Sequence, residues 1–449
     1  MTSNSGLESK VPYCSELGQK KSTTQTLLGI CTLIGGILLN IVAGNLLTWG
    51  MIYPYIGSYL RSLDSSVSFS EVYSALPLSF LIENIGVFAA PFLIRIGGTR
   101  KTLLEGGALT SLSFMICSLL KSSTAVVWTY AVLFGTGAGI ITITSFFPAW
   151  DHFPRSRGMV TGFIMSGYSA SNLVFGLLFT YLANPTNKEP TNLDFGEEVN
   201  RNIPYVMLLM GLVFAGVTIV GVFLVREARV HTQALMSAPL GEFSVRQMLS
   251  ERQFWGMFFL GYTVFFFWYF FVGVFKSYGL QVFGDDHFLA YIGSMAGAAG
   301  GVGRVFWPSL LDYFSFRKVM TCSMILQLVG CSSLHFIVAN KYLYGAVVVV
   351  LFFCCSAVYP SLAVETNNIF HPYSSQVWPF IYLAATLASI SSIVLKYIGE
   401  AVGYFYIYAV CSLVILTSIV LLGTIRREPV KWAKSKEIQE VLLDQLLKI

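Results

Sequence analysis

The chain has 449 residues, of which 55% are hydrophobic and only 11% charged, with a formal net charge of +5. An ordinary soluble domain carries about 25% charged residues, so this composition excludes a water-soluble globular protein. So small a net charge gives no reason to expect a nucleic-acid partner. The eight cysteines fit no metal or disulfide spacing, and we expect neither a metal nor a cofactor.

The N-terminal residues are polar and lack the apolar core of a signal peptide. Apolar stretches of about 20 residues follow, the length that crosses a bilayer as a helix. They are too long for barrel strands, and a helix satisfies its own backbone in hydrocarbon. Twelve such spans are predicted, at about 27–54, 72–94, 102–120, 125–148, 158–183, 203–225, 254–278, 287–311, 319–338, 342–364, 376–398 and 402–424.

These spans predict an all-α membrane protein in five parts. They are an N-terminal tail (1–26), a six-helix bundle (27–225), a long polar loop (226–253), a second six-helix bundle (254–425) and a C-terminal tail (426–449). The last tail has apolar residues at 438, 441, 442, 446 and 449, which is an amphipathic helical period. It suits a membrane surface or a partner protein equally well.

The distribution of basic residues predicts the orientation. An even number of spans puts both termini on one side, where 20 Lys and Arg residues gather against 7 on the other side. Since basic loops stay in the cytosol, we expect a multi-pass protein with both termini cytosolic. The plasma membrane is the expected location, with an organelle membrane as the alternative. Arg304 belongs to neither side, because it lies within a span.

Two loops indicate an internal duplication. PFLIRIGGTRK (91–101) follows the second span and PSLLDYFSFRK (308–318) follows the eighth, at an offset of 217 residues. The same offset carries Phe153, after span four, onto Phe370, after span ten. Two parallel six-helix halves are therefore predicted. In transporters built this way the substrate site lies between the halves, near the bilayer midplane.

These loops resemble those of the major facilitator superfamily. The second copy and the residues just before it (303–318) are similar to the motif Gly-Arg-x3-Gly-x3-Asp-x4-Arg-Arg/Lys, with Pro308 in place of the second glycine. The first copy keeps Arg100 and Lys101 but has Arg95 where an acid is usual. WGMIYPYIGSYLRS (49–62) and FFPAWDHFPRSRGMVTG (146–162) resemble the oxalate/formate antiporter and monocarboxylate transporter group. The resemblance implies the major facilitator fold and transport by alternating access.

Arg304 is the leading candidate for substrate binding. It lies about 12 Å along its helix from Asp312, deep in the hydrocarbon region, where an arginine is costly without water or a partner. We expect it to face a cavity and hold a substrate carboxylate, bidentately if the geometry allows. The alternative is a structural ion pair or a contact with backbone carbonyls. In the resembling family an arginine on this helix contacts the anionic substrate.

Glu83 lies about 18 Å from the end of its span, near the midplane. Burial there favours the neutral acid, so Glu83 is a candidate for proton coupling as the cavity alternates between the two sides. The alternative is a protonated acid that hydrogen-bonds a neighbouring helix, or a pair with Arg304.

Other residues are candidates for the cavity wall or for a gate, although helix packing is an alternative role for each. The wall candidates are Tyr168, Asn172, Tyr262, Trp268, Tyr359 and Tyr382. The gate candidates are Asp312, Arg317, Lys318, Arg100 and Lys101, at the predicted cytosolic surface. Plain positive-inside topology is the alternative explanation for the basic ones.

The substrate class follows from a missing charge. Oxalate transporters of the resembling family carry a lysine in span eleven, near Ala385 here, and this stretch has none. Lys396 lies near the outer interface, where its amine is expected to snorkel towards water. A single buried cation suits a monoanion better than a dianion, so a monocarboxylate, or an amino acid bound through its carboxylate, is the expected substrate.

We therefore predict a secondary active transporter for a small organic anion, coupled to protons or to a counter-anion. The alternatives are an amino-acid facilitator of the same fold and a receptor or complex subunit that does not transport. No Walker A sequence, nucleophile–base set or metal cluster is present, so an enzyme is not expected.

Overall fold

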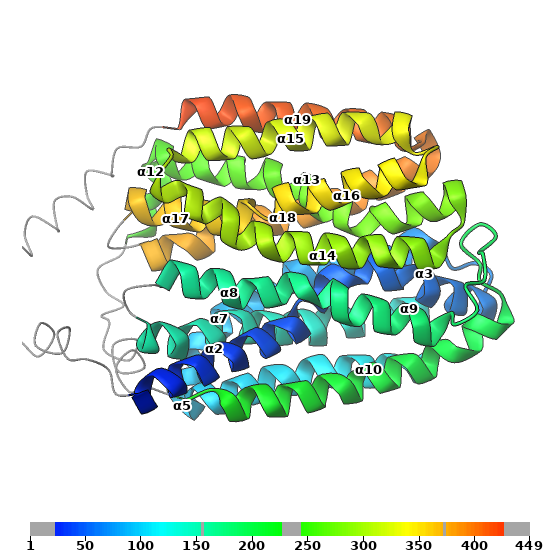
Figure 1. Cartoon of the computed structure of the whole chain (residues 1–449), viewed down its shortest axis with the longest axis horizontal. Coiled ribbons are helices and arrows are strands. Elements are labelled where there is room, and N and C mark those ends of the chain that lie inside the picture. The colour runs from blue at the N-terminus through cyan, green and yellow to red at the C-terminus, as the bar shows by residue number, and fades with distance from the viewer. Residues whose placement is uncertain (1–22, 154–156, 227–243, 371–373, 426–449) are drawn as a thin grey trace, which may run out of the picture.

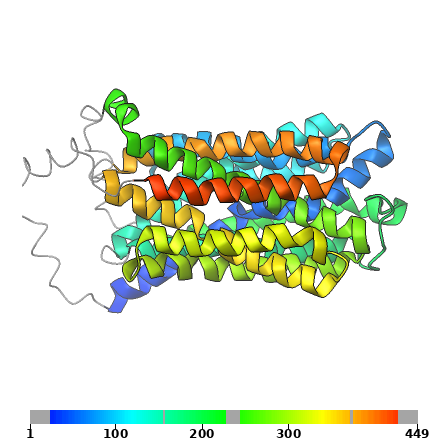
Figure 2. The same cartoon turned by 90° about the horizontal axis from the view of Figure 1, so that it is seen from above.

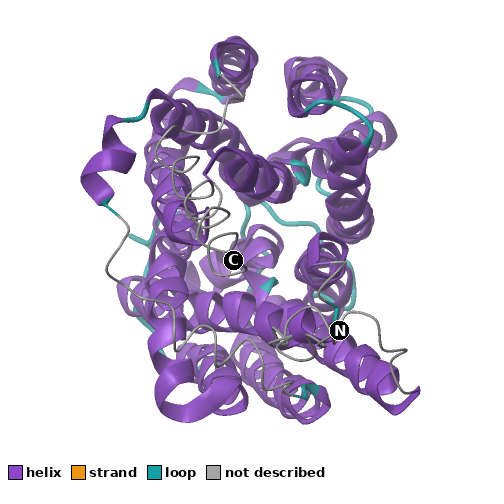
Figure 3. Cartoon of the chain, turned by 90° about the vertical axis from the view of Figure 1, so that its left-hand side faces the viewer, coloured by secondary structure: helices purple, strands orange, loops and turns teal. Residues whose placement is uncertain are grey.

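The computed structural model describes residues 23–153, 157–226, 244–370 and 374–425, which form a bundle of long helices. The helices run side by side along the long axis of the molecule (Figures 1 and 2), and Figure 3 shows them end-on. Within these residues the only extended pairing is one bridge between Thr191 and Asp194. The predicted all-α fold is therefore confirmed.

The helices divide into two sequential sets, with the first below the second in Figure 1. The first set comprises α2 (Thr23–Ala43), α3 (Asn45–Leu63), α4 (Phe69–Tyr73), α5 (Ala75–Cys117), α6 (Ser123–Thr129), the π-helical segment η2 (Tyr130–Phe134), α7 (Gly135–His152), α8 (Arg157–Ser171), the π-helical segment η3 (Asn172–Gly176), α9 (Leu177–Ala183) and α10 (Glu197–Leu224). The second set comprises α12 (Val245–Ser250), α13 (Arg252–Phe283), α14 (Asp286–Ser309), the 3-10 turn η4 (Leu310–Asp312), α15 (Phe316–Ile337), α16 (Lys341–Cys355), α17 (Val358–Phe370), α18 (Ser374–Val402) and α19 (Tyr404–Thr424). The predicted loop 226–253 thus contains the short helix α12, while the C-terminal tail (426–449) lies outside the described residues.

Ten helices of the described chain are long and apolar enough to cross a membrane. The predicted spans 102–120 and 287–311 are not among them. Both are nevertheless helical, since the first largely coincides with the later part of α5 and the second lies on the glycine-rich α14. All twelve predicted spans therefore fall on helices of the bundle.

A glycine separates the second span from the third. The helix α5 is interrupted at Gly98, whose φ of 78° and ψ of 166° lie outside the helical region. A positive φ of this kind favours glycine, because a side chain would clash with the backbone. Gly98 belongs to the first copy of the repeated loop, so the break between the second and third spans depends on a backbone conformation that glycine favours.

The described chain begins and ends at the same end of the bundle, on the left in Figure 1. We call this the terminal end. The opposite or distal end carries the loops 64–68, 184–196 and 284–285. The two halves meet chiefly where α8 packs on α14, α5 on α18 and α3 on α13. The seam between the halves is therefore made of long helices, and the candidate site lies within it.

Candidate functional site

A small cavity lies in the seam between the halves. Its walls come from α3, α5, α7 and α8 on one side and from α13, α14, α17 and α18 on the other. The lining residues are Leu47, Phe80, Glu83, Val87, Thr142, Met165, Tyr168, Phe265, Trp268, Tyr269, Arg304, Tyr359 and Tyr382. The cavity volume is about 40 Å³, which is room for only a few water molecules. In this conformation the halves are closed around a polar centre.

Arg304 supplies the positive charge of the cavity. Its side chain is buried, and Nη1 donates a hydrogen bond to the backbone oxygen of Met165 at 3.2 Å, across the seam. The guanidinium carbon lies 5.2 Å from the ring centre of Tyr168, a cation–π distance. Nε has no hydrogen-bond partner, and Arg304 forms no ion pair with any described residue. A buried guanidinium with an unused donor is suited to an anionic ligand.

Glu83 supplies the acidic group. It is 3% exposed, and its Oε1 accepts a hydrogen bond from the hydroxyl of Tyr168 at 3.3 Å. Its Oε2 is buried and makes no hydrogen bond. Tyr168 therefore connects the two charged residues, with its hydroxyl on Glu83 and its ring against Arg304.

Aromatic rings form the rest of the wall. Tyr269 stacks on Phe80 across the seam, with ring centres 4.0 Å apart, and its hydroxyl lies 3.4 Å from that of Tyr382. Tyr382 in turn packs edge-on against Tyr359 at 5.4 Å. From the run FFFWYFF (265–271) the sequence singled out Trp268 but not Tyr269, because every side of this helix is aromatic and no periodic pattern marks the side that faces the cavity. The hydroxyls of this cluster add hydrogen-bonding capacity to an otherwise apolar surface.

The structure brings most of the predicted wall residues together. Tyr168, Trp268, Tyr359 and Tyr382 all line the cavity with Arg304 and Glu83. Two others lie elsewhere.

The first of these is Tyr262, whose hydroxyl is 2.8 Å from that of Ser391, within the second half. The second is Asn172, which lies at the contact of η3 with α14. Its backbone oxygen accepts a hydrogen bond from Ser294 at 3.3 Å, and its buried amide makes none. Neither residue lines the cavity in this conformation.

The duplication is visible in the cavity itself. Positions 87 and 304, 142 and 359, and 165 and 382 all line it, and each pair is 217 residues apart, the offset of the repeated loops. In every pair the first half carries the smaller or less polar side chain (Val87, Thr142, Met165) and the second half carries arginine or tyrosine. The site is thus built on symmetric positions but is chemically asymmetric.

The predicted gate residues make contacts within their own halves. Arg100 donates from Nε and Nη2 to the Val225 oxygen, at 2.8 and 2.7 Å, and Arg317, 217 residues later, donates to the Ile425 oxygen. Each arginine thereby holds the chain just after the last helix of its half, whose final carbonyls have no intrahelical partner. Lys101 pairs with Glu105 at the surface.

The two remaining gate candidates are Lys318 and Asp312. The Lys318 side chain is exposed, and the Asp312 side chain lies outside the described part. A role for the five residues in gating remains a prediction.

Two lysines are placed differently from the expectation of an outer-surface charge. Lys396 is 2% exposed, and its Nζ donates to the Tyr404 hydroxyl at 3.0 Å and faces the ring of Tyr73. Snorkelling to the interface is therefore wrong for this residue. Lys276, which is one of the 7 basic residues predicted on the non-cytosolic side, is completely buried.

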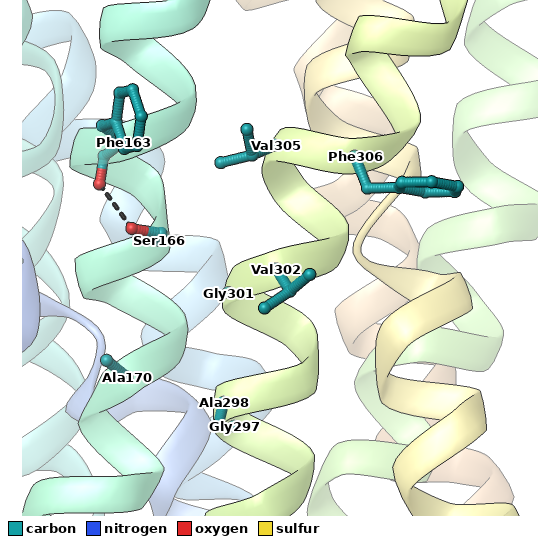
Figure 4. Close-up of a pocket in the computed structure, with 9 residues that line it drawn as sticks. All are labelled: Phe163, Ser166, Ala170, Gly297, Ala298, Gly301, Val302, Val305 and Phe306. Atoms are coloured by element: carbon teal, nitrogen blue, oxygen red, sulfur yellow. Dashed lines mark hydrogen bonds between the residues drawn. The ribbon is translucent and has the colours of Figure 1, made fainter.

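A larger apolar groove lies on the side of the bundle, between α8 and α14 (Figure 4). Its volume is about 480 Å³. It is lined by Phe163, Ser166, Ala170, Gly297, Ala298, Gly301, Val302, Val305 and Phe306. Ser166 already donates to the Phe163 oxygen at 2.7 Å, and Val305 points from α14 towards α8. This lining offers an anion neither a charge nor an unused donor, unlike the central cavity.

Two six-helix halves around a polar cavity are the architecture of many membrane transporters. The chain belongs to the Major Facilitator Superfamily, which matches residues 38–373. Among the described residues, no group of three His, Cys, Asp or Glu side chains could hold a metal ion.

Two relatives come from the group that the sequence motifs resemble. The chain is 23% identical over 381 residues to Apicoplast pyruvate carrier 1 of Toxoplasma gondii, covering 64% of this chain and 68% of the relative. It is 24% identical over 329 residues to the oxalate:formate antiporter of Oxalobacter formigenes, covering 72% and 74%. The crystal structure of a D-xylose-proton symporter shares the fold, with a TM-score of 0.64 over 90% of this chain and 99% of that chain, at 15% identity.

Proposed function

We propose that this chain transports a small monocarboxylate across a membrane by alternating access, coupled to protons or to a counter-anion. The substrate carboxylate binds Arg304 in the central cavity. Rocking of the two halves exposes that cavity first to one side of the membrane and then to the other. Following the distribution of basic residues, the terminal end faces the cytosol.

The observation that carries this proposal is the state of Arg304. A buried charge normally has a charged partner, because leaving it unpaired is costly. Arg304 instead has one backbone carbonyl and one ring face, and its Nε is unused. A carboxylate can take two parallel hydrogen bonds from a guanidinium and would supply the missing charge.

The number of cations in the cavity supports a monoanion. Arg304 is the one basic residue among those that line it. The stretch 379–392, in which the resembling oxalate transporters carry a lysine, has none here. Relatives named as a pyruvate carrier and an oxalate:formate antiporter handle small carboxylates. With Glu83 also in the cavity, a dianion would meet more repulsion than a monoanion.

Glu83 is the proposed proton site. It faces the same cavity, where opening to water changes its surroundings, and Tyr168 links it to the substrate-binding arginine. A carboxyl group in this position can gain a proton when the cavity faces one side and lose it when the cavity faces the other. In a symporter, the proton on Glu83 would cross the membrane together with the substrate. In an exchanger, it would cross back with the counter-anion.

The test is uptake by the purified full chain in proteoliposomes. Radiolabelled monocarboxylates, dicarboxylates and amino acids are compared with and without a pH gradient. We expect a monocarboxylate to be taken up, and Arg304→Ala to abolish that uptake while the exposed Arg201→Ala leaves it unchanged.

Two other results of the uptake experiment would contradict the proposal of monocarboxylate transport. Uptake of amino acids alone would identify a facilitator for those substrates. The absence of any uptake would favour a receptor or complex subunit.

A further inference from the structure

A buried charge pair lies at the distal end of the seam, away from the cavity. Lys276 on α13 and Asp286 at the start of α14 form an ion pair, with Nζ 2.9 Å from Oδ1 and both side chains 0% exposed. Both residues belong to the second half, whose helices α13 and α14 are joined by the short turn at 284–285. The pair therefore does not by itself join the two halves.

The other oxygen of Asp286 does join them. Oδ2 accepts hydrogen bonds from the Tyr55 hydroxyl and from Asn184 Nδ2, the latter at 2.8 Å, and both donors come from the first half. Lys276 adds a weaker contact in the same direction, from Nζ to the Tyr55 hydroxyl at 3.2 Å. The two oxygens of the carboxylate therefore contact different halves: Oδ1 pairs with Lys276 of the second half, and Oδ2 accepts hydrogen bonds from the first half.

Further contacts surround this point at the distal end. The His287 backbone N–H donates to Asn187 Oδ1 at 2.9 Å, and His287 Nε2 lies 2.6 Å from the Asn184 oxygen. The hydroxyls of Tyr181 and Tyr291 are also hydrogen-bonded to each other across the seam. All of these contacts connect the segment 181–187 to the first turns of α14. Lys396 on α18 also faces the Tyr73 ring of the first half, so the first turns of α14 are one of the places where the halves are held together towards this end.

We propose that Oδ2 of Asp286 is the latch of the distal end. Tyr55 and Asn184 bind it when that end is closed and leave it when that end opens, while Lys276 remains bound to Oδ1. The retained ion pair keeps the carboxylate oriented, so that the same two donors can bind again. This latch presupposes the alternating-access transport proposed above, and it names the residues that decide when the distal end opens.

Tyr55→Phe tests the latch directly, because it removes one donor and keeps the ring, which lies 4.5 Å from Lys276 Nζ. Asn184→Ala removes the other donor to the same oxygen. Tyr344→Phe is the matched control, since this buried tyrosine donates to the Phe275 oxygen within one half. Each protein is first checked for a single peak in gel filtration, and either latch variant that folds suffices for the test.

The reporter is a cysteine at position 294, introduced as Ser294→Cys. Ser294 is 2% exposed in the seam, and it lies about 12 Å along α14 from Asp286. A charged methanethiosulfonate reagent is applied to the full chain in nanodiscs. Mass spectrometry of the peptide that contains residue 294 separates this label from label on the native cysteines.

Removal of a hydrogen bond to a charged group is expected to speed labelling about tenfold in Tyr55→Phe and in Asn184→Ala. Tyr344→Phe should label at the rate of the Ser294→Cys parent. A latch variant that folds and labels no faster than the parent overturns the proposal. Because labelling needs no substrate, this outcome is independent of whether any anion is transported.

Discussion

Glu83 and Arg304 line one cavity without forming an ion pair with each other. Tyr168 lies between them, with its hydroxyl 3.3 Å from Glu83 Oε1 and its ring 5.2 Å from the guanidinium carbon. A direct pair would neutralise both charges inside the protein and leave neither for a ligand. In the observed arrangement the Glu83 carboxyl group and the Arg304 guanidinium face the same small cavity, and each has one polar atom without a hydrogen-bond partner.

The first prediction concerns the geometry of the guanidinium. Arg304→Lys retains the positive charge but replaces a planar, two-pronged donor by a compact ammonium group. We expect the KM for the carboxylate to rise about tenfold with a smaller effect on the maximal rate, because one of two parallel hydrogen bonds is lost. Initial uptake rates over a range of substrate concentrations measure this. An unchanged KM would mean that a point charge suffices and that bidentate binding is wrong.

The second prediction concerns the proton. Glu83→Gln keeps the shape of the side chain and the acceptor for Tyr168 but cannot exchange a proton. Uptake driven by a pH gradient should be lost, while exchange of labelled for unlabelled substrate at equal pH should persist. The control is Glu105→Gln, which removes an acid at the surface, where it pairs with Lys101. If Glu83→Gln still accumulates substrate along a pH gradient, the coupling site lies elsewhere.

The helices and the duplication could be predicted because they depend on features that are local in sequence. A span is read from about 20 consecutive apolar residues, and the repeat from two loops at one offset. The same offset then places Arg304, Tyr359 and Tyr382 opposite Val87, Thr142 and Met165 in the cavity. Arg304 and Glu83 were found because a charge deep in a span is costly and therefore conspicuous.

The orientation of each helix about its own axis could not be predicted in the same way. Asn172 begins the π-helical segment η3, so the helical period that precedes it does not continue unchanged. Tyr262 and Tyr269 lie on one aromatic helix, and only the packing of α13 on its neighbours turns the second towards the cavity. A uniformly apolar helix gives no periodic signal of the kind that amphipathic helices provide.

The buried Lys276–Asp286 pair was missed for a related reason. Each residue lies near the end of a span, where a charge is ordinarily solvated or snorkels to the interface. Their pairing depends on the turn between α13 and α14, at which Gly284 takes a φ of 68°. A single sequence does not predict contacts across such a turn. It does not predict the contact from Tyr55, on a helix far away in the sequence, either.

The third prediction concerns Asp285, the neighbour of the latch residue. Asp285 caps α14 by accepting from the Phe288 N–H at 3.1 Å and pairs with Lys341 at 2.8 Å. Its partial burial acts to raise the pKa, but the hydrogen bonds from Lys341 and Phe288 outweigh it, so the pKa of Asp285 is lowered. Asp285→Ala should cost about 1 kcal/mol of stability at neutral pH, the usual value of a helix cap.

The sign of the pH dependence follows from the lowered pKa. A carboxyl group with a depressed folded-state pKa stabilises fully above its unfolded pKa of about 3.9 and loses this effect as the pH falls through the folded value. The difference in Tm between Asp285→Ala and the parent should therefore be constant from pH 5 to 8 and shrink below about pH 4. Thermal unfolding in detergent, followed by tryptophan fluorescence, measures it. A difference that grows in acid would contradict the lowered pKa.

The last prediction separates the ion pair from the latch that is built on it. Lys276→Met leaves the Asp286 carboxylate buried without its cation, and breaking a buried pair in this way costs about 3–5 kcal/mol. The double variant Lys276→Met, Asp286→Asn removes both charges and keeps an oxygen that accepts from Tyr55 and Asn184. We expect it to recover most of the lost stability, because a neutral amide costs far less to bury than a lone carboxylate. Thermal unfolding of the three proteins gives the comparison, and a double variant no more stable than Lys276→Met would show that the unpaired carboxylate is not the source of the lost stability.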